Sequence, residues 1–418
     1  MSEQKTATGF PEIKVPALWT FAALVLGFVA AILLKGSPAL APLLALAEPM
    51  GSLWLKALQL TILPLVIGLV VTGISQTLAA ANGGALARRA VGMFVLVLLV
   101  AGTMSALLVP ALIELFPIPA KAVAALSGGA GDAGKVPGVA DILNAMMPEN
   151  IFAAAAAGAM LPVVIFAALF ALALTRIGEP QRQSITRFFE GLAGAMMVIV
   201  GWVLMLAPLG VFGLAMSLGA KTGADAIGAL AHYIVVVTAA GLVVLLAGYG
   251  LAITLGGKKL GEFTRAMVPV NAVAISTQSS LASLPAMLAA TRKLGVREST
   301  ADFVLPMAVA IFRATSPAMN LAVAIYAAYL TGTPLTAAAL VAGVFVAFLV
   351  SLSSVSLPGT ISFVISVGPI ANAMGVPIAP LALLVAVEML PDIMRTLGNV
   401  TLDVAVTSAA DRGSGSEA

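Results

Sequence analysis

The sequence of 418 residues contains no cysteine and only one histidine, His232. The absence of cysteine excludes disulfides and thiol chemistry, and one histidine cannot form a multi-histidine metal centre. Because His232 begins an apolar run, we interpret it as an interfacial or packing residue. Nothing in the sequence matches a phosphate-binding loop, a nucleophile elbow or a zinc motif. The sequence therefore indicates neither an ATP-driven protein nor an enzyme.

Charged residues are also scarce, at 9% of the chain, whereas a typical soluble domain has about 25%. Hydrophobic residues make up 61%, which predicts an all-α polytopic membrane protein. The net charge of +3 is assigned to basic loops, so no nucleic-acid binding is expected. Apolar stretches of about 20 residues or more, long enough to cross a membrane as helices, lie at 16–34, 51–76, 90–116, 151–176, 189–214, 231–255 and 300–330.

Two further apolar segments, 258–290 and 334–372, are interrupted by the serine-rich sequences NAVAISTQSSLASLP and SLSSVSLPGT. Lysines and arginines gather in cytoplasmic loops only if each segment enters and leaves on one side of the membrane. We therefore predict eight transmembrane helices plus two re-entrant helical hairpins, with both termini cytoplasmic. The alternative is a pair of ordinary surface loops. With the spans that follow them, the hairpins form an inverted repeat, 258–330 and 334–408, an arrangement typical of transporters.

The apolar stretch 384–406 carries an unusual set of polar residues. If it is one α-helix, they fall within an arc of about 100°: Glu388, Asp392, Arg395, Thr396, Asn399 and Asp403. Ionisable groups in hydrocarbon usually face a protein interior or a wet cavity and mark a substrate or ion path. The alternative is a single structural ion pair between Asp392 and Arg395. Pro391, inside this helix, is predicted to kink it.

These features resemble the dicarboxylate/amino acid:cation symporter family, which includes glutamate/aspartate and C4-dicarboxylate transporters. The resemblance covers about 16–408 and rests on LQLTILPLVIGLVVTGIS, APLGVFGL, SSLASLP, VLPM, LPGT and, most specifically, D-I-M-R-T-x-x-N-V-T-x-D at 392–403. The family implies an inverted-repeat elevator-type fold and a homotrimer. Residues 1–255 would then form mainly the scaffold, from spans 1, 2, 4 and 5. Spans 3 and 6 would join the transport core at 256–408, and 409–418 would be a polar tail.

In the family pattern, Asp392 binds the amino group of an acidic amino acid and Arg395 binds its side-chain carboxylate. A guanidinium fork suits a carboxylate. Family members that carry plain dicarboxylates lack this aspartate, so its presence favours an amino acid substrate, unless Asp392 only neutralises an arginine. The remaining substrate-binding residues implied by the resemblance are Thr396, Asn399, Ser279, Ser280, Arg313, Thr315, Ser316, Ser356 and Gly359.

The cation motifs depart from the family pattern. Where the family has Asn-Met-Asp-Gly-Thr, two of them sodium ligands, this chain has Phe312, Arg313, Ala314, Thr315 and Ser316. Asn399 and Asp403 remain as possible residual sodium ligands, and hard cations need several oxygens. We hypothesise that Arg313 supplies a tethered positive charge near Asp403 and that Glu388 is the leading proton carrier. The alternative is that Arg313 is a structural partner of a carboxylate.

The sequence therefore predicts a secondary active symporter that carries a small acidic amino acid or a dicarboxylate across the inner membrane. Coupling is expected to use protons, or sodium to a reduced extent. The expected partners are the anionic solute, the coupling cation, membrane lipid and further copies of the chain in a homotrimer, with no cofactor. Alternatives are a sodium-coupled C4-dicarboxylate symporter and, from other classes, a substrate-gated anion-conducting channel or a non-transporting receptor.

Overall fold

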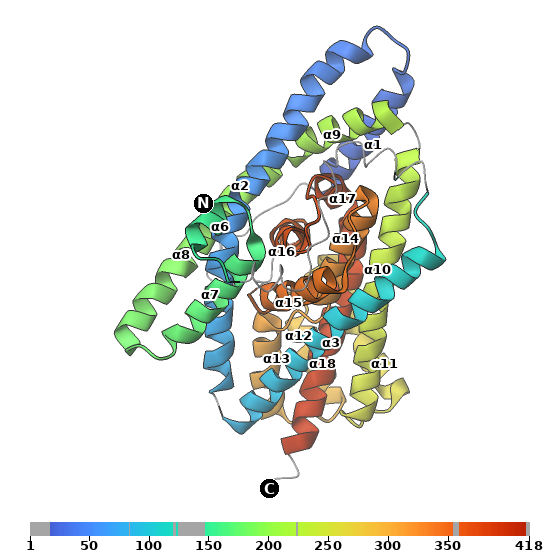
Figure 1. The fold of residues 1–418 in the computed structure, drawn as a ribbon. Coiled ribbons are helices and arrows are strands. Elements are labelled where there is room, and N and C mark those ends of the chain that lie inside the picture. Colours follow the sequence, from blue (N-terminus) through green and yellow to red (C-terminus); the bar gives the residue numbers. More distant parts are fainter. Residues whose placement is uncertain are drawn as a thin grey trace, which may run out of the picture.

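The computed structural model describes residues 17–82, 84–119, 123, 147–222, 225–353 and 359–414, and all regular secondary structure in these ranges is helical (Figure 1). The first helices are α1 (Ala17–Leu33), α2 (Leu40–Ala81), α3 (Ala85–Leu115), α6 (Ile151–Ala156), α7 (Met160–Leu174), α8 (Glu179–Met205), α9 (Ala207–Thr222) and α10 (Asp225–Thr254). They are followed by α11 (Leu260–Thr277), α12 (Leu284–Lys293), α13 (Glu298–Ile311), α14 (Ser316–Thr331), α15 (Ala337–Ser353), α16 (Gly359–Ala373), α17 (Leu381–Leu384), the 3-10 turn η1 (Val385–Val387) and α18 (Met389–Ser414).

Many of these helices are long and apolar. Five stretches have the length and composition to cross a membrane: Leu40–Ala81, Ala85–Leu115, Glu179–Met205, Gly228–Thr254 and Glu298–Thr331. Shorter apolar helices cover Leu18–Leu33, Met160–Leu174, Ala207–Ala220 and Ala337–Leu352. The predicted all-helical class is confirmed, whereas eight membrane helices with two re-entrant hairpins stay a prediction.

Two of the predicted spans in the N-terminal half are not single helices. Within 151–176 the chain breaks between α6 and α7, where Gly158 has a φ of +73°, a left-handed conformation that glycine adopts without strain. Within 189–214, α8 ends and α9 begins around Leu206. Pro208 is the second residue of α9, where its missing N–H costs no helical hydrogen bond. Hydrophobic length alone did not reveal either break.

The N-terminal helices form one packed group in which α9 contacts both α1 and α2, and α2 also contacts α7 and α8. Glycines of α9 allow this helix to lie close to α2. A Cβ on Gly213 would lie 2.3 Å from the carbonyl oxygen of Ala47, and one on Gly210 would lie 2.3 Å from the ring of Trp54. The Trp54 indole also donates a hydrogen bond of 2.9 Å to the Val203 carbonyl of α8. Such close backbone approach is typical of helix packing in membranes.

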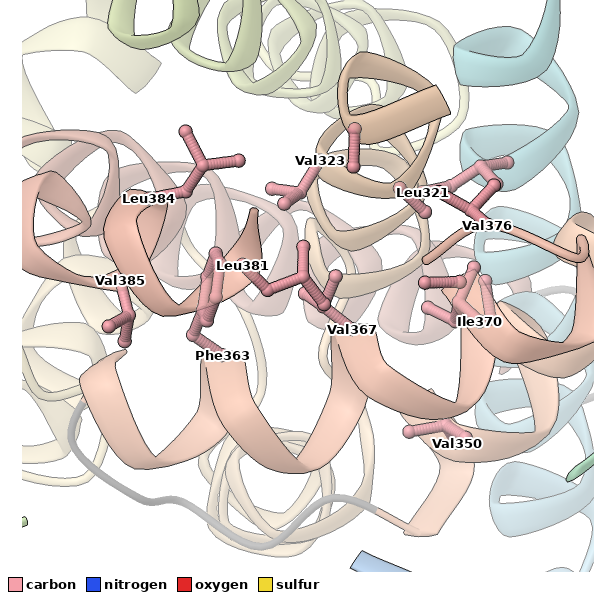
Figure 2. Packing of buried hydrophobic residues seen from close by; sticks show 14 of the residues in the cluster. Leu321, Val323, Val350, Phe363, Val367, Ile370, Val376, Leu381, Leu384 and Val385 are labelled. Carbon is pink, nitrogen blue, oxygen red and sulfur yellow. The ribbon is translucent and has the colours of Figure 1, made fainter. Parts of the chain in front are cut away.

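The C-terminal helices are arranged around α18, which packs against α3, α10, α11, α12 and α13 (Figure 1). Helices α11 and α12 pack against each other across the turn 278–283, and α15 packs against α16. These two helix pairs correspond to the predicted hairpins. Figure 2 shows how apolar side chains from α14 to η1 point into one core, among them Leu321, Val350, Phe363 and Leu381.

Candidate functional site

The site is built where the chain is interrupted between α13 and α14, against the middle of α18. The predicted span 300–330 is interrupted at this point, because residues 312–315 are not helical. The backbone N–H of Thr315 donates to Asn399 Oδ1 at 3.0 Å, and its hydroxyl lies 2.8 Å from the same oxygen. That hydroxyl also lies 3.1 Å from the Arg395 carbonyl. Asn399 thus satisfies a backbone donor that the start of α14 leaves without a helical partner.

Two glycines let three helices converge on this site. A Cβ on Gly398 would lie 2.4 Å from Cγ2 of Thr315, closer than any real contact, so only glycine fits against the interruption. A Cβ on Gly241 of α10 would lie 2.8 Å from Met319 of α14 and from Met394 of α18. The close packing of α10, α14 and α18 therefore depends on residues without side chains.

The predicted continuous terminal helix is also wrong at its beginning. After α17 and η1, α18 begins only at Met389, so that Glu388 lies at the junction. Pro391 therefore occupies the first turn of α18, where an N–H has no partner within the helix. The predicted kink inside the helix does not arise, and the N–H of Asp392 donates to the Glu388 carbonyl at 2.9 Å.

Arg395 is the centre of a buried cluster of charges. Its Nη2 forms an ion pair with Glu388 Oε1, and its Nη1 donates to Asn320 Oδ1 at 2.7 Å. Its Nε lies 3.3 Å from Asp392 Oδ1. The second oxygen of Glu388 accepts a hydrogen bond of 2.7 Å from the hydroxyl of Tyr233. The guanidinium is thus held by side chains from α14 and α18 and from the junction before α18.

Arg313 lies in the interruption between α13 and α14 and is buried. Its electrostatic neighbours include Asp392 and Asp403. Among the described residues, none donates a hydrogen bond to the carboxylate oxygens of Asp403. Phe312, next to Arg313, stacks on Phe94 of α3 with ring centroids 4.4 Å apart. The stacked rings of Phe94 and Phe312 therefore cover the interruption on the side of α3. The neighbouring guanidinium of Arg313 lies within electrostatic range of the carboxylates of α18.

All the charged side chains that are buried in the described part of the chain belong to this site: Arg313, Glu388, Asp392, Arg395 and Asp403. If each is ionised, three carboxylates and two guanidinium groups leave one net negative charge. An isolated charge is very costly in a low-dielectric interior, whereas paired charges are tolerated. The arrangement can therefore exchange one carboxylate for another on Arg395, and it can take up a proton or a cation.

Two other predicted residues lie within the same region. Thr396 is buried, and its hydroxyl donates to the Asp392 carbonyl at 3.0 Å. Ser316 is the first residue of α14 and is also buried, with its N–H donating to the Arg313 carbonyl at 2.9 Å. Their hydroxyls are therefore near the charged groups without taking part in the ion pairs.

The structure connects the predicted site residues of the two hairpins to α18 less directly. Ser280 is buried, and Ser279 Oγ accepts a hydrogen bond of 3.2 Å from the N–H of Ala282. Among the hydrogen bonds of the described residues, none joins either serine to α18, although α11 and α12 pack against that helix. Gly359 is the first residue of α16, and Ser356 lies outside the described residues.

The analysis of the sequence missed two partners of the charged groups, Tyr233 and Asn320. Asn320 follows Ser316 by four residues and so shares its helix face, which was an available signal. No comparable signal in the sequence pointed to Tyr233, which lies within an apolar span. Its neighbour His232 is half-buried, with Nε2 2.7 Å from the Phe116 carbonyl oxygen and Nδ1 3.2 Å from the hydroxyl of Tyr326. These contacts agree with the packing role expected for the histidine.

Two predicted oxygen donors for a residual sodium site, Asn399 and Asp403, already have neighbours in the structure. The amide oxygen of Asn399 already accepts from Thr315, and Asp403 lies within electrostatic range of Arg313. In the ranges that the structure covers, no group of three or more histidine, aspartate or glutamate side chains could hold a metal ion. A hard cation would need several further oxygens.

Comparison with known proteins extends over nearly the whole chain. The profile of the sodium:dicarboxylate symporter family matches residues 17–412. The proton/sodium-glutamate symport protein of Bacillus subtilis (strain 168) is 28% identical over 393 residues, covering 91% of this chain and 88% of that protein. C4-dicarboxylate transport protein 1 of Pseudomonas aeruginosa (strain UCBPP-PA14) is 28% identical over 361 residues, covering 84% and 79%. The chain therefore belongs to the sodium:dicarboxylate symporter family and is a membrane transporter, not an enzyme.

Proposed function

We propose that this protein is a secondary active symporter that carries a small acidic amino acid or a dicarboxylate across the inner membrane by an elevator mechanism. The observation that carries the proposal is the buried cluster around Arg395, where a guanidinium is held by two carboxylates between apolar helices. Such groups in a membrane protein mark the path of a solute or an ion. The names of the relatives, a glutamate symporter and a C4-dicarboxylate transporter, fit a site for carboxylates.

Substrate binding is proposed to occur by exchange on Arg395. Glu388 already pairs with this guanidinium, and a substrate carboxylate can take the same place because a guanidinium fork accepts either one. Asp392 then binds the ammonium group of an amino acid, which a plain dicarboxylate would lack. The rest of the substrate site is proposed to comprise Thr396, Asn399, Ser279, Ser280, Arg313, Thr315, Ser316, Ser356 and Gly359.

The proposed exchange also supplies a reason for proton coupling. A substrate that displaces Glu388 leaves a buried carboxylate without its guanidinium, which is unfavourable until a proton neutralises it. We assign Glu388 as the leading proton carrier, with Asp403 and Asn399 contributing to coupling. Arg313 acts as a tethered positive charge beside Asp403 and reduces the need for sodium. The neighbours that Asn399 and Asp403 already have, Thr315 and Arg313, support this assignment.

The moving unit is proposed to contain α3, α10 and the helices from α11 to α18, and the scaffold to contain α1, α2, α7, α8 and α9. The packing of each group within itself supports this division. In the proposed homotrimer, the scaffold joins the copies and the second hairpin, α15 and α16, acts as the gate.

The test is uptake of labelled aspartate, glutamate and succinate into proteoliposomes. Sodium is replaced by choline, and each measurement is made with and without an inward proton gradient. We expect uptake without sodium that increases when the outside is more acidic. Strict dependence on sodium would contradict the tethered-charge assignment and would favour a sodium-coupled dicarboxylate symporter. Substrate-gated current without matching uptake would indicate a channel.

Two variants separate binding from coupling. Arg395→Ala is expected to weaken substrate binding by at least about a hundredfold, because a charge-assisted pair is lost, corresponding to ~2.7 kcal/mol. Glu388→Gln is expected to retain binding and to lose the response to the proton gradient, because the amide cannot titrate. Binding is measured by isothermal titration and coupling by uptake. Unchanged binding in Arg395→Ala would overturn the proposed site, and a normal pH response in Glu388→Gln would remove Glu388 from the coupling mechanism.

A further inference from the structure

An apolar groove lies between α2, α3, α7 and α15. It has a volume of about 400 Å³, within the range of sites that hold drug-sized molecules. None of the described residues that line it is charged, and the one hydroxyl among them, on Thr77, already donates to the Gly73 carbonyl within α2. The groove therefore offers only hydrocarbon surface to an occupant. It shares no lining residue with the charge cluster around Arg395.

The groove opens to the outside of the molecule. Leu169, Leu172 and Phe345 line it and are 51%, 47% and 37% exposed. Large exposed apolar side chains on long apolar helices face acyl chains rather than water. The opening is therefore accessible from the bilayer.

Two arginines follow or precede lining residues by about one helical turn: Arg88 near the start of α3 and Arg176 just past the end of α7. Arg88 precedes the lining residues Val91 and Val95 by three and seven positions, so it shares their helix face. Arg176 follows Leu172 by four positions, just past the end of α7. Both arginines are exposed, and neither guanidinium takes part in an ion pair within the described ranges. Each of two helices that line the groove therefore carries an exposed positive charge about one turn beyond its lining residues.

We propose that this groove holds an acyl chain of an anionic phospholipid, with the lipid phosphate bound by Arg88 and Arg176. An amphiphile with a negative head matches both the hydrocarbon surface and the guanidinium pair, which suits phosphate. A zwitterionic lipid would have no preference for these arginines, and a free phosphate would not use the groove. The site goes beyond the proposed function and does not depend on it. If the elevator division is correct, the lipid lies between the scaffold and the moving unit.

The absence of native cysteine allows a direct test with single-cysteine variants. Leu169→Cys, labelled with bimane, is reconstituted in vesicles of phosphatidylcholine that contain an equal fraction of either brominated phosphatidylglycerol or brominated phosphatidylcholine. The bromine quenches bimane on contact. From two arginines near the lipid head we expect a local preference of about tenfold for the anionic lipid, and hence stronger quenching. Leu96→Cys is the matched control, because Leu96 is 61% exposed on α3 without lining the groove.

The excess quenching at Leu169→Cys is expected to disappear when Arg88→Gln and Arg176→Gln are combined, and to persist in Arg187→Gln, an exposed arginine of α8. These substitutions replace exposed side chains and leave the apolar packing unchanged. Equal quenching by the two lipids would overturn the proposal. So would an excess of the same size at Leu96→Cys, or one that survives the loss of both arginines. Because quenching is measured without transport, a failure here and a failure of the proposed function are distinguishable.

Discussion

At the residue scale, the Arg395 guanidinium is shared by three protein groups: Glu388 at the junction before α18, Asp392 within α18 and Asn320 on α14. A guanidinium with protein partners is stable in an apolar interior without a solute, because its charge is compensated. In the proposed exchange, a solute therefore competes with Glu388 for Arg395. Tyr233 donates a hydrogen bond to the other oxygen of Glu388. Glu388 can still accept this bond after a solute has replaced it at Arg395 in the proposed exchange. The loaded site of this exchange matches the empty site in charge compensation once Glu388 has taken up a proton.

Gly398 gives a prediction at the same scale. Gly398→Ala places a Cβ where Cγ2 of Thr315 would be only 2.4 Å away, and threonine is stiff at χ1. Overpacking of this kind costs about 1–3 kcal/mol, and the shift of Thr315 disturbs its bonds to Asn399. We expect a lower melting temperature in detergent and weaker substrate binding.

The control for Gly398→Ala is Gly250→Ala in α10, where a Cβ meets no atom within 4 Å. Alanine there is expected to be neutral or slightly stabilising, by up to about 1 kcal/mol. The double variant Gly398→Ala/Thr315→Ser removes the clashing methyl group and is expected to recover most of the lost stability. If Gly398→Ala is as stable as Gly250→Ala, the close approach of the interruption to α18 is wrong.

At the scale of elements, the polar last turn of α18 is tied to the start of α13. Asp411 Oδ1 accepts hydrogen bonds of 2.8 Å from Arg297 Nε and of 2.8 Å from the Thr300 hydroxyl. Partial burial, the largest single influence, raises the pKa of Asp411. The hydrogen bonds and the charge of Arg297 together outweigh it, so that the pKa is lowered from its ordinary value. The contact therefore fixes the end of α18 most firmly when Asp411 is ionised.

The sign of the pH effect follows from this lowered pKa. The stabilisation is complete above the unfolded pKa of Asp411, about 4, and is lost as the pH falls through the lower, folded value. Asp411→Asn is expected to lower the melting temperature at neutral pH, by an amount that corresponds to less than about 1 kcal/mol because the arginine is half exposed. The difference from the unchanged protein should shrink below about pH 4. A difference that stays constant with pH would assign the contact to packing alone.

Some features of these elements could be predicted from the sequence, and others could not. The polar face of α18 was predictable, because Asp392, Arg395 and Asn399 recur at helical spacing in an apolar stretch, and they are buried together. The interruption at 312–315 was not predicted, although Arg313, Thr315 and Pro317 break the apolar run there, because the group that stabilises it, Asn399, lies in a distant segment. Asn320 became recognisable as a partner only when α14 and α18 were brought together in space.

At the scale of the whole molecule, the elevator proposal requires the contact between α2 and α16 to slide. A Cβ built on Gly368 of α16 would lie 3.1 Å from Cδ1 of Ile62 of α2, so these positions face each other. A double variant, Ile62→Cys/Gly368→Cys, places two thiols on facing positions that can be joined by oxidation or, if the Cβ atoms are too far apart for a disulfide, by a short bifunctional thiol reagent. No native cysteine competes with the pair.

Cross-linking of Ile62→Cys/Gly368→Cys joins the proposed scaffold to the proposed moving unit. The cross-linked protein should bind substrate in solution and lose at least nine-tenths of its uptake into vesicles, and a reductant should restore uptake where the link is a disulfide. Each single variant should transport equally with and without the oxidant or reagent, which controls for damage by it. A fixed-body mechanism, in which only the first hairpin (α11 and α12) moves, leaves the contact between α2 and α16 in place throughout the cycle. Full uptake by the cross-linked double variant, with the link verified by mass spectrometry, would therefore favour a gate in a static body over an elevator.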